Sequence, residues 1–570
     1  MPTSRDILLL ALTTVAALVL RLAGADFLLP QLVESDSLVI HGQVGHLERR
    51  DPHPETDRNF GFYPLLLARA TAFVFDDEPP AETAAGLPEH LRRASATHVH
   101  VRLVGAALSA LLVPAIWLLA RRFVSAGAAH FAAALAGAST LELWFAPQGR
   151  PHAAAAAFTL LAMVAALRLR DRDGPLDYAI AGIALALAVG ALESGFALLP
   201  AFALALLLRD PPARWSSIAW VALPLGILAL AVRWLYPFAF AGGGGGNAPE
   251  VAVRAGTLNL FGHLIFLDQF RGAGFAKLFG ALRDYDPWIS ALGAFGLVLA
   301  IPRRIPERWR ELAVVLAYAL PYALAAGLYA RTYQRFAMPL VPYACLLAAW
   351  GIERLTRPLP AFVRVLAFLA ALAPQAWLAV RLAANRLEPD TIELAARWIE
   401  RNVAPERERV LVLPSLEIPL PATQAALEES ARMSDNANRP WFRYQRAIDA
   451  SARPKPAWDL IAMPMVTDAD REEIHRDPVA YLRNLRAKWA VIEVYGEGRK
   501  PPVLRDVRIG LEKIADRVAR FVPDAVDEGQ DLPLVFQDDE FARTSPWAWR
   551  AARAQRLGPV MEIWRIREGS

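Results

Sequence analysis

Long apolar runs dominate the first 383 residues of the chain. A bilayer core of about 30 Å takes roughly 20 helical residues, and apolar runs of about this length recur between polar loops. They predict eleven membrane-spanning helices, at 6–24, 101–120, 126–146, 151–169, 176–193, 195–209, 216–237, 287–302, 311–330, 335–354 and 360–383. The fifth and sixth runs are short enough to form one bent unit, so ten to twelve spans fit the pattern. The pattern predicts a multi-pass α-helical membrane protein.

Charges in the short loops predict how these spans are oriented. Arginines follow spans two, four, six, eight and ten, at positions 121, 122, 168, 170, 172, 209, 214, 303, 304, 308, 310, 354 and 357. Positive charge in short loops is typical of the cytoplasmic side, so we expect a cytoplasmic N-terminus. The loops 25–100 and 238–286 and the tail 384–570 would then lie outside the plasma (inner) membrane.

The first apolar run has a second interpretation. Ala23, Gly24 and Ala25 resemble the small-residue cleavage site of a signal peptide. Arg21 interrupts the run before that site, however, and the run is long enough to span. We therefore favour a retained anchor, and residue 34 lies outside in either case.

The tail after residue 383 has a different pattern. An amphipathic helix after residue 390 precedes three apolar segments of strand type, at 409–413, 488–495 and 560–566. The chain is thus divided into a membrane domain, 1–383, with a large first outer loop, 25–100, and a soluble α/β domain, 384–570. No glycine-rich phosphate-binding motif occurs in the tail, so nucleotide binding there has no support.

Composition agrees with the membrane class. Hydrophobic residues make up 55% of the 570 residues, and the formal net charge of +4 is too small to indicate a nucleic-acid partner. The single cysteine, Cys345, excludes an intrachain disulfide.

The stretch QLVESDSLVIHGQ, residues 31–43, places two carboxylates just after the first span. In a helix, Asp36 shares a face with apolar residues such as Val33 and Ile40, whereas Glu34 lies on a more polar face. A carboxylate on a buried face is paired, hydrogen-bonded or functional. Two interpretations stay open: Asp36 is a structural partner of an arginine such as Arg102, or it takes part in chemistry.

Cationic side chains gather at the predicted outer ends of two other spans. Arg150 and His152 begin span four, and Arg331 and Arg335 precede span ten. Arginine forks suit phosphate oxygens, so these residues suggest a phosphate-bearing substrate. The alternative is that each arginine only reaches for lipid headgroups. A metal site that joins His152 to His98 and His100 has weak support, because no close ligand cluster is evident.

Four segments together resemble integral-membrane glycosyltransferases of the GT-C superfamily, of the protein O-mannosyltransferase and aminoarabinose transferase type. They are the acidic motif after the first span, RRDPHP with NFGFYPLLLA (49–68), QGRPH (148–152) and YQRFAMPLVPYACLLAAWGIERL (333–355). Ser37 stands where this family often has Glu after its Asp.

The resemblance implies transfer of a sugar from a polyprenyl-phosphate carrier to a lipid, glycan or protein acceptor at the outer face. Asp36 would be the base, with Glu34 beside it. The donor phosphate would bind Arg150, Arg331 or Arg335, and His152, Arg102 and Tyr63 are further candidates. No cofactor is implied with certainty, and a divalent metal ion stays open.

A transporter or lipid flippase is the alternative from another class. Its path would be lined with charges inside the membrane. The charges of this chain gather at span ends instead, and no two matching halves are evident. A non-catalytic scaffold would leave the acidic stretch without a role.

Overall fold

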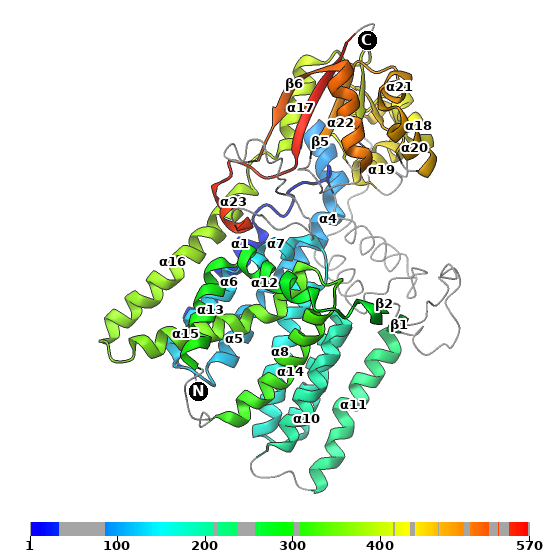
Figure 1. Ribbon diagram of the computed structural model, residues 1–570. Coiled ribbons are helices and arrows are strands. Elements are labelled where there is room, and N and C mark those ends of the chain that lie inside the picture. Colours follow the sequence, from blue (N-terminus) through cyan, green and yellow to red (C-terminus); the bar gives the residue numbers. More distant parts are fainter. Residues whose placement is uncertain are drawn as a thin grey trace.

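The computed structural model describes most of the chain in two parts, a helical part and a smaller C-terminal part (Figure 1). The described residues are 2–32, 86–209, 215–235, 257–260, 263–300, 308–413, 416–433, 439–465, 467–494, 502–523, 534 and 546–567. We call those up to residue 385 the helical part and those from residue 390 the C-terminal part.

The helical part is built mainly from α-helices, most of them apolar. They are α1 (Ser4–Leu22), α4 (Leu87–Ala110), α5 (Leu112–Ala120), α6 (Ala126–Gly137), α7 (Thr140–Phe145), α8 (His152–Asp171), α9 (Pro175–Ala191), α10 (Leu199–Leu207), α11 (Trp215–Leu235), α12 (Ala273–Tyr285), α13 (Pro287–Ala300), α14 (Trp309–Leu328), α15 (Val341–Thr356) and α16 (Ala361–Asn385). The 3-10 helices η1 (Ala146–Gln148), η2 (Glu193–Leu198) and η5 (Gln334–Leu340) and the hairpin of β1 (Thr257–Leu260) and β2 (His263–Phe266) connect some of them.

Several of these helices are long and apolar enough to cross a membrane. In the described part of the chain there are five, Leu87–Ala120, His152–Asp171, Trp309–Leu328, Gln334–Thr356 and Ala361–Asn385. Shorter apolar helices lie at Pro175–Ala191, Glu193–Leu207, Trp220–Arg233 and Pro287–Ala300. Helix α8 is the most enclosed of the long helices, and the small side chains of 153–157, all alanine, are buried against its neighbours. The chain is therefore a helical protein of membrane type.

The predicted span 126–146 is divided into two helices, α6 and α7. Asp286 explains the break, since one of its carboxylate oxygens accepts a hydrogen bond from the Thr140 amide at 2.7 Å and another from Gln375 Nε2 at 3.0 Å. Ser139 Oγ donates to the other oxygen at 2.5 Å. The first amides of α7 thus have a carboxylate partner, as helix starts require.

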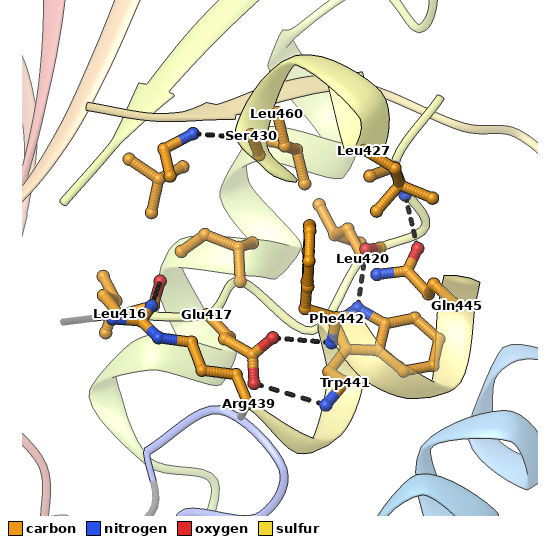
Figure 2. Close-up of a pocket in the computed structure, with 14 residues that line it drawn as sticks. Leu416, Glu417, Leu420, Leu427, Ser430, Arg439, Trp441, Phe442, Gln445 and Leu460 are labelled. Carbon is orange, nitrogen blue, oxygen red and sulfur yellow. Dashed lines mark hydrogen bonds between the residues drawn. The ribbon is translucent and has the colours of Figure 1, made fainter. Parts of the chain in front are cut away.

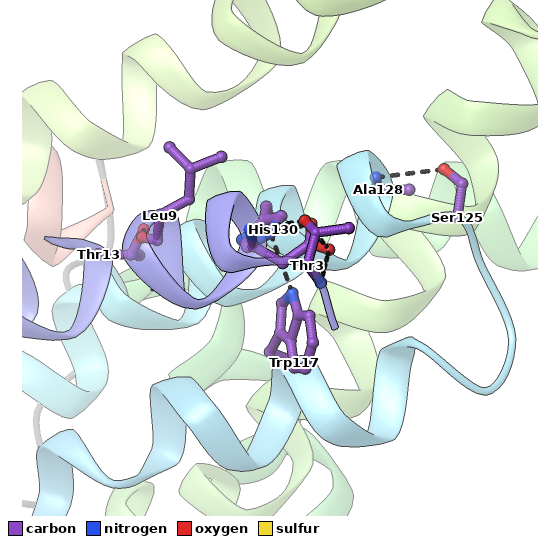
Figure 3. Close-up of polar contacts among 8 residues, drawn as sticks. Thr3, Leu9, Thr13, Trp117, Ser125, Ala128 and His130 are labelled. Carbon is purple, nitrogen blue, oxygen red and sulfur yellow. Dashed lines mark hydrogen bonds and ion pairs between the residues drawn. The ribbon is translucent and has the colours of Figure 1, made fainter. Parts of the chain in front are cut away.

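The N-terminal end of α1 packs beside α5 and α6 (Figure 3). His130 Nε2 lies 3.3 Å from Trp117 Nε1 and 3.3 Å from an oxygen of Asp6. Thr3 caps α1 and Ser125 caps α6. The polar side chains named here thus have hydrogen-bond partners within the protein.

The C-terminal part is a mixed α/β structure. Its elements are α17 (Thr391–Asn402), β3 (Arg409–Val412), α18 (Gln424–Met433), α19 (Pro440–Ala447), β4 (Asp459–Ala462), α20 (Asp468–Arg476), α21 (Pro478–Asn484), β5 (Trp489–Val494), α22 (Pro502–Ile514), β6 (Ala515–Phe521), α23 (Trp547–Arg553) and β7 (Val560–Ile566). Strands β3, β5 and β7 occupy the three predicted strand segments.

The five strands form one sheet in the order β4-β3-β5-β7-β6. Strand β3 is parallel to β4 and β5, and Val410 lies opposite Leu460 and Trp489. Strand β7 is antiparallel to β5 and β6. All six residues of β5 are buried, as expected for a strand covered on both faces.

The two parts contact each other through α23 against α16 and α19 against α4. The rings of Trp144 and Trp547 lie 4.5 Å apart between their centroids. At the end of α16, Asn385 Nδ2 donates to the carbonyls of Ala551 and Ala554. Buried aromatic and polar contacts therefore join the C-terminal part to the helices.

Candidate functional site

The predicted site residues fall into two groups. Glu34, Asp36 and Tyr63 lie outside the described residues. The others, Arg102, Arg150, His152, Arg331 and Arg335, are described.

Arg335 and His152 are in direct contact. His152 is the first residue of α8, and Arg335 lies in η5, which follows α14. Arg335 Nε donates to His152 Nε2 over 3.2 Å, and both side chains are buried. Because His152 Nε2 is the acceptor, its imidazole is neutral in this arrangement, with the proton on Nδ1. The fold thus joins the predicted outer ends of two spans.

Aromatic rings surround this contact. The Arg335 guanidinium lies 4.4 Å from the Tyr333 ring centroid, and the His152 ring is stacked on Phe336 at 5.6 Å. The Lys277 ammonium lies 5.8 Å from the same Tyr333 ring. We call Arg335, His152, Tyr333, Phe336 and Lys277 the Arg335 cluster. Two cations beside one aromatic ring favour an anionic ligand.

Close packing of α12 against α14 places Lys277. A Cβ on Gly274 would come within 2.1 Å of the Ala326 carbonyl oxygen, and one on Gly327 within 2.3 Å of the Phe275 ring. Only glycine fits at these two positions, and Lys277 follows Gly274 by three residues, on nearly the same helix face. Our sequence analysis did not select Lys277. A signal existed, because Lys277 is the only lysine in residues 1–384.

Arg150 and Arg331 have different surroundings. Arg150 is buried just before α8, next to Gly149, whose φ of +71° forms the turn between η1 and α8. Arg331 is exposed, and its guanidinium lies 4.9 Å from the centroid of the Phe266 ring in the β1–β2 hairpin.

Arg102 holds the beginning of the first outer loop. It is buried in α4, and its Nη1 donates to the carbonyls of Ala25 at 2.9 Å and Phe27 at 2.7 Å. Both hydrogen bonds are donated by one guanidinium nitrogen, and both acceptors are backbone carbonyl oxygens. The contacts indicate a structural role in fixing the turn after α1.

The candidate metal ligands do not gather. His98 and His100 both lie within α4, where residues two apart point to different faces. The extended conformation in which they would share a face is not formed. Within the described ranges no three His, Cys, Asp or Glu side chains are grouped to hold a metal ion.

A second candidate is a cavity in the C-terminal part, beyond the carboxyl ends of β3 and β4 (Figure 2). Glu417 accepts hydrogen bonds from the amides of Phe442 at 2.7 Å and Trp441 at 3.3 Å, and thereby caps α19. Burial raises the pKa of Glu417 to about 7. The cavity measures about 50 Å³, whereas an apolar cavity that admits benzene has about 150 Å³. It has room for a few water molecules and not for a sugar ring.

Comparison with known families gives one match, over residues 93–236. The family is described as dolichyl-phosphate-mannose-protein mannosyltransferase. The predicted resemblance to GT-C glycosyltransferases is confirmed over this region, which begins within α4 and contains α5 to α11, Arg150 and His152. No curated protein matches the chain in sequence.

Solved structures similar to the chain include AglB, ArnT and the Pmt1-Pmt2 complex. AglB, an oligosaccharyltransferase from Archaeoglobus fulgidus in complex with an inhibitory peptide and a dolichol-phosphate, is 14% identical, with a TM-score of 0.47 over 91% of this chain and 73% of that chain. ArnT from Cupriavidus metallidurans, bound to undecaprenyl phosphate, is 14% identical, with a TM-score of 0.45 over 99% and 98%. The protein O-mannosyltransferase Pmt1-Pmt2 complex from S. cerevisiae, bound to the sugar donor, is 19% identical, with a TM-score of 0.32 over 48% and 37%. At these identities and TM-scores the likenesses do not establish a function for this chain.

Proposed function

We propose that this chain is a membrane glycosyltransferase that moves a sugar from a polyprenyl-phosphate donor to an acceptor at the outer face of the plasma membrane. The observation that carries the proposal is the match of residues 93–236 to a family of mannosyltransferases. The Arg335 cluster supports it, since it brings cations together at one end of α8 and suits the phosphate of a lipid-linked donor. The acceptor is a lipid, a glycan or a protein, and no nucleic acid takes part.

In this proposal the donor phosphate binds at the Arg335 cluster. Arg335 and Lys277 neutralise its charge, and Arg150 and Arg331 are the further candidate ligands of the phosphate. His152 holds the Arg335 side chain in place through the 3.2 Å contact. Negative charge grows on the phosphate as the sugar leaves, so fixed cations at this point stabilise the transition state.

The transfer step is a direct displacement. An acceptor hydroxyl oxygen forms a bond to the anomeric carbon while the bond from that carbon to the phosphate oxygen breaks. Asp36 takes the hydroxyl proton, Glu34 is its partner in the same stretch of sequence, and Tyr63 is a further candidate site residue. The polyprenyl phosphate leaves with the electron pair, and the anomeric centre is inverted. A divalent ion on the phosphate is compatible with this step and is not required by it.

The decisive experiment replaces the proposed base. Asp36→Asn in membranes, assayed with a radiolabelled polyprenyl-phosphate sugar, should lower transfer about 100- to 10,000-fold. Asp76→Asn, in the same loop, is the matched control and should leave transfer unchanged. Wild-type transfer by a folded Asp36→Asn protein would refute the base assignment. Movement of substrate across vesicles without covalent transfer would favour the transporter alternative.

The orientation needs a separate test. The proposal places the N-terminus in the cytoplasm, the transferase domain at 1–383 and the tail at 384–570 outside. Cys345 is buried, so a new thiol at the exposed Ser451 (Ser451→Cys) can be labelled selectively. A membrane-impermeant maleimide should label it in intact cells, and labelling only after lysis would reverse the orientation.

A further inference from the structure

The C-terminal part touches the chain at both ends of residues 33–85. This interval carries Glu34 and Asp36, and it is bounded by Leu32 on one side and by the start of α4 on the other. The contacts at both ends are polar, buried or part-buried, and made by residues after 389.

The first end is held at Gln31. Gln31 Nε2 donates to a carboxylate oxygen of Asp390 at 2.9 Å, and the Gln31 carbonyl accepts from the Glu417 amide at 3.0 Å. Asp390 also caps α17 through the amides of Ile392 and Glu393. The position of Gln31 is therefore tied to the frame of the C-terminal part.

The chain leading to Gln31 is fixed as well. Gly24 has a φ of +63°, and a Cβ on it would meet Arg386 at 2.6 Å, so only glycine fits there. Arg386 Nη2 donates to the Leu20 carbonyl at 2.6 Å, and Arg102 holds Ala25 and Phe27. Arg386, just after α16, and Arg102 thus hold residues 20–27, and the C-terminal part holds residue 31.

The second end is held at His90, in the first turn of α4. His90 Nδ1 lies 2.9 Å from the Tyr444 hydroxyl, and the His90 side chain is fully buried. The two rings also touch edge to face, with centroids 5.7 Å apart. Tyr444 lies in α19, whose first amides are capped by the same Glu417 whose own amide binds Gln31. One small region of the C-terminal part therefore contacts both ends.

We propose that the C-terminal part is a clamp on the first outer loop, and that Gln31, Asp390, His90 and Tyr444 are positioning residues for transfer. This inference rests on the function proposed above. Asp36 follows Gln31 by only five residues in the sequence, so the covalent chain couples the base to the point where Gln31 is held. An error in the position of Gln31 is therefore passed on to the proposed base, and a small misplacement of a catalytic group lowers the rate strongly.

The test loosens both ends without removing any packing ring. Gln31→Met and Tyr444→Phe, combined in the full chain, delete the two side-chain hydrogen bonds and keep the Glu417–Gln31 backbone bond. Tyr481→Phe is the matched control, because the Tyr481 hydroxyl donates to the Pro464 carbonyl inside the C-terminal part. Asp390→Asn is the conservative variant, since its Oδ1 can still cap α17 and its Nδ2 can donate to Gln31 Oε1 once the Gln31 amide has turned over.

Three readouts separate positioning from stability. In the double variant, trypsin should cleave about tenfold faster at Arg49, Arg50, Arg58 and Arg69, and kcat for transfer should fall about tenfold, because each lost bond leaves a buried polar partner unsatisfied. The donor KM should stay within about twofold and the thermal midpoint should match that of Tyr481→Phe. Asp390→Asn should keep the wild-type kcat.

Each other outcome is informative. Unchanged cleavage in 33–85 would overturn the clamp, and faster cleavage with an unchanged kcat would overturn the positioning role. A uniform rise in cleavage along the whole chain, with a lower thermal midpoint, would mean that these contacts only stabilise the fold. If the wild-type protein shows no transfer while the variant is cleaved faster in the loop, the proposed function fails and the clamp stands.

Discussion

The helical part buries two kinds of arginine. Arg102 donates to two backbone carbonyls, and Arg21 donates to the carbonyls of Ala17 and Gly137 and to Ser109 Oγ. Arg335 instead donates to the imidazole of His152 and lies across the Tyr333 ring, with Lys277 beside the same ring. The three guanidinium groups are similarly buried but have different partners.

The partners decide what each arginine can do. A guanidinium bound to carbonyls is part of the backbone hydrogen-bond network, and an anion would have to displace those oxygens. A guanidinium with a neutral ring nitrogen and aromatic faces among its neighbours lies in surroundings that suit an incoming phosphate. We therefore expect Arg335 to act on the substrate and Arg102 to act on the fold.

The sharpest test of this comparison is Arg335→Gln. The glutamine keeps a polar side chain and removes the charge, so transfer should fall about 100- to 1,000-fold, as when one transition-state donor is lost. Arg335→Lys should recover part of the rate, because it restores the charge without the fork. The measurement is kcat/KM with a polyprenyl-phosphate sugar. Full activity of folded Arg335→Gln would show that Arg335 does not act on the substrate, and that the two kinds of buried arginine do not differ in function.

Arg102→Gln should show the opposite behaviour. Two buried carbonyls lose a charged donor, so the free energy of unfolding should fall by ~3 kcal/mol. Transfer per folded molecule should stay close to wild type. Thermal unfolding in detergent and an activity assay normalised to folded protein measure the two effects. A stable but inactive Arg102→Gln protein would indicate that Arg102 takes part in transfer itself.

Lys277→Met sharpens the comparison at a smaller scale. Lys277 shares the Tyr333 ring with Arg335 but is partly exposed, so solvent weakens its attraction to the phosphate. We expect about tenfold weaker binding of polyprenyl phosphate and an unchanged thermal midpoint. Arg283→Met is the matched control, because Arg283 lies in the same helix and pairs with Asp284. Equal losses in both variants would indicate a general charge effect.

The regular elements were the easiest to predict. Helix α16, Ala361–Asn385, matches the predicted span 360–383 within two residues, and β3, β5 and β7 lie at the predicted strand segments. Each has a long apolar run or a strand-type segment, so the local pattern alone identifies it. Helix α12 and the β1–β2 hairpin were missed, because they lie in a segment that we assigned to a loop.

The site depends more on tertiary contacts. Span topology put His152 and Arg335 at one surface, and the structure brings them into contact. The carbonyl partners of Arg102 belong to the turn after α1, and the place of Lys277 depends on Gly274 packing against α14. Periodicity describes one element at a time, so neither contact can be found from it. The roles of Asp36 and Glu34 stay predictions.

Arg439, in the C-terminal part, is another arginine that donates to a backbone carbonyl, and the pH dependence of stability tests its role. Its Nη1 donates to the Leu416 carbonyl, as in the structural kind, and its charge faces Glu417. Burial raises the pKa of Glu417 from 4.5 to about 7 in spite of this charge. The folded protein therefore holds the proton to a higher pH than the unfolded chain, so the free energy of unfolding falls as the pH rises from about 4.5 to 7.

Glu417→Gln removes this dependence, because glutamine stays neutral at every pH. The variant loses one amide acceptor at all pH values, but relative to wild type it should gain about 2 kcal/mol between pH 5 and pH 8. Thermal midpoints of both proteins across this range measure the difference. Glu428→Gln, close by in α18, is the control and should follow the wild-type curve. Parallel curves for wild type and Glu417→Gln would mean that Arg439 keeps Glu417 ionised, and Arg439 would then act as an ion-pair partner rather than as a donor to the backbone alone.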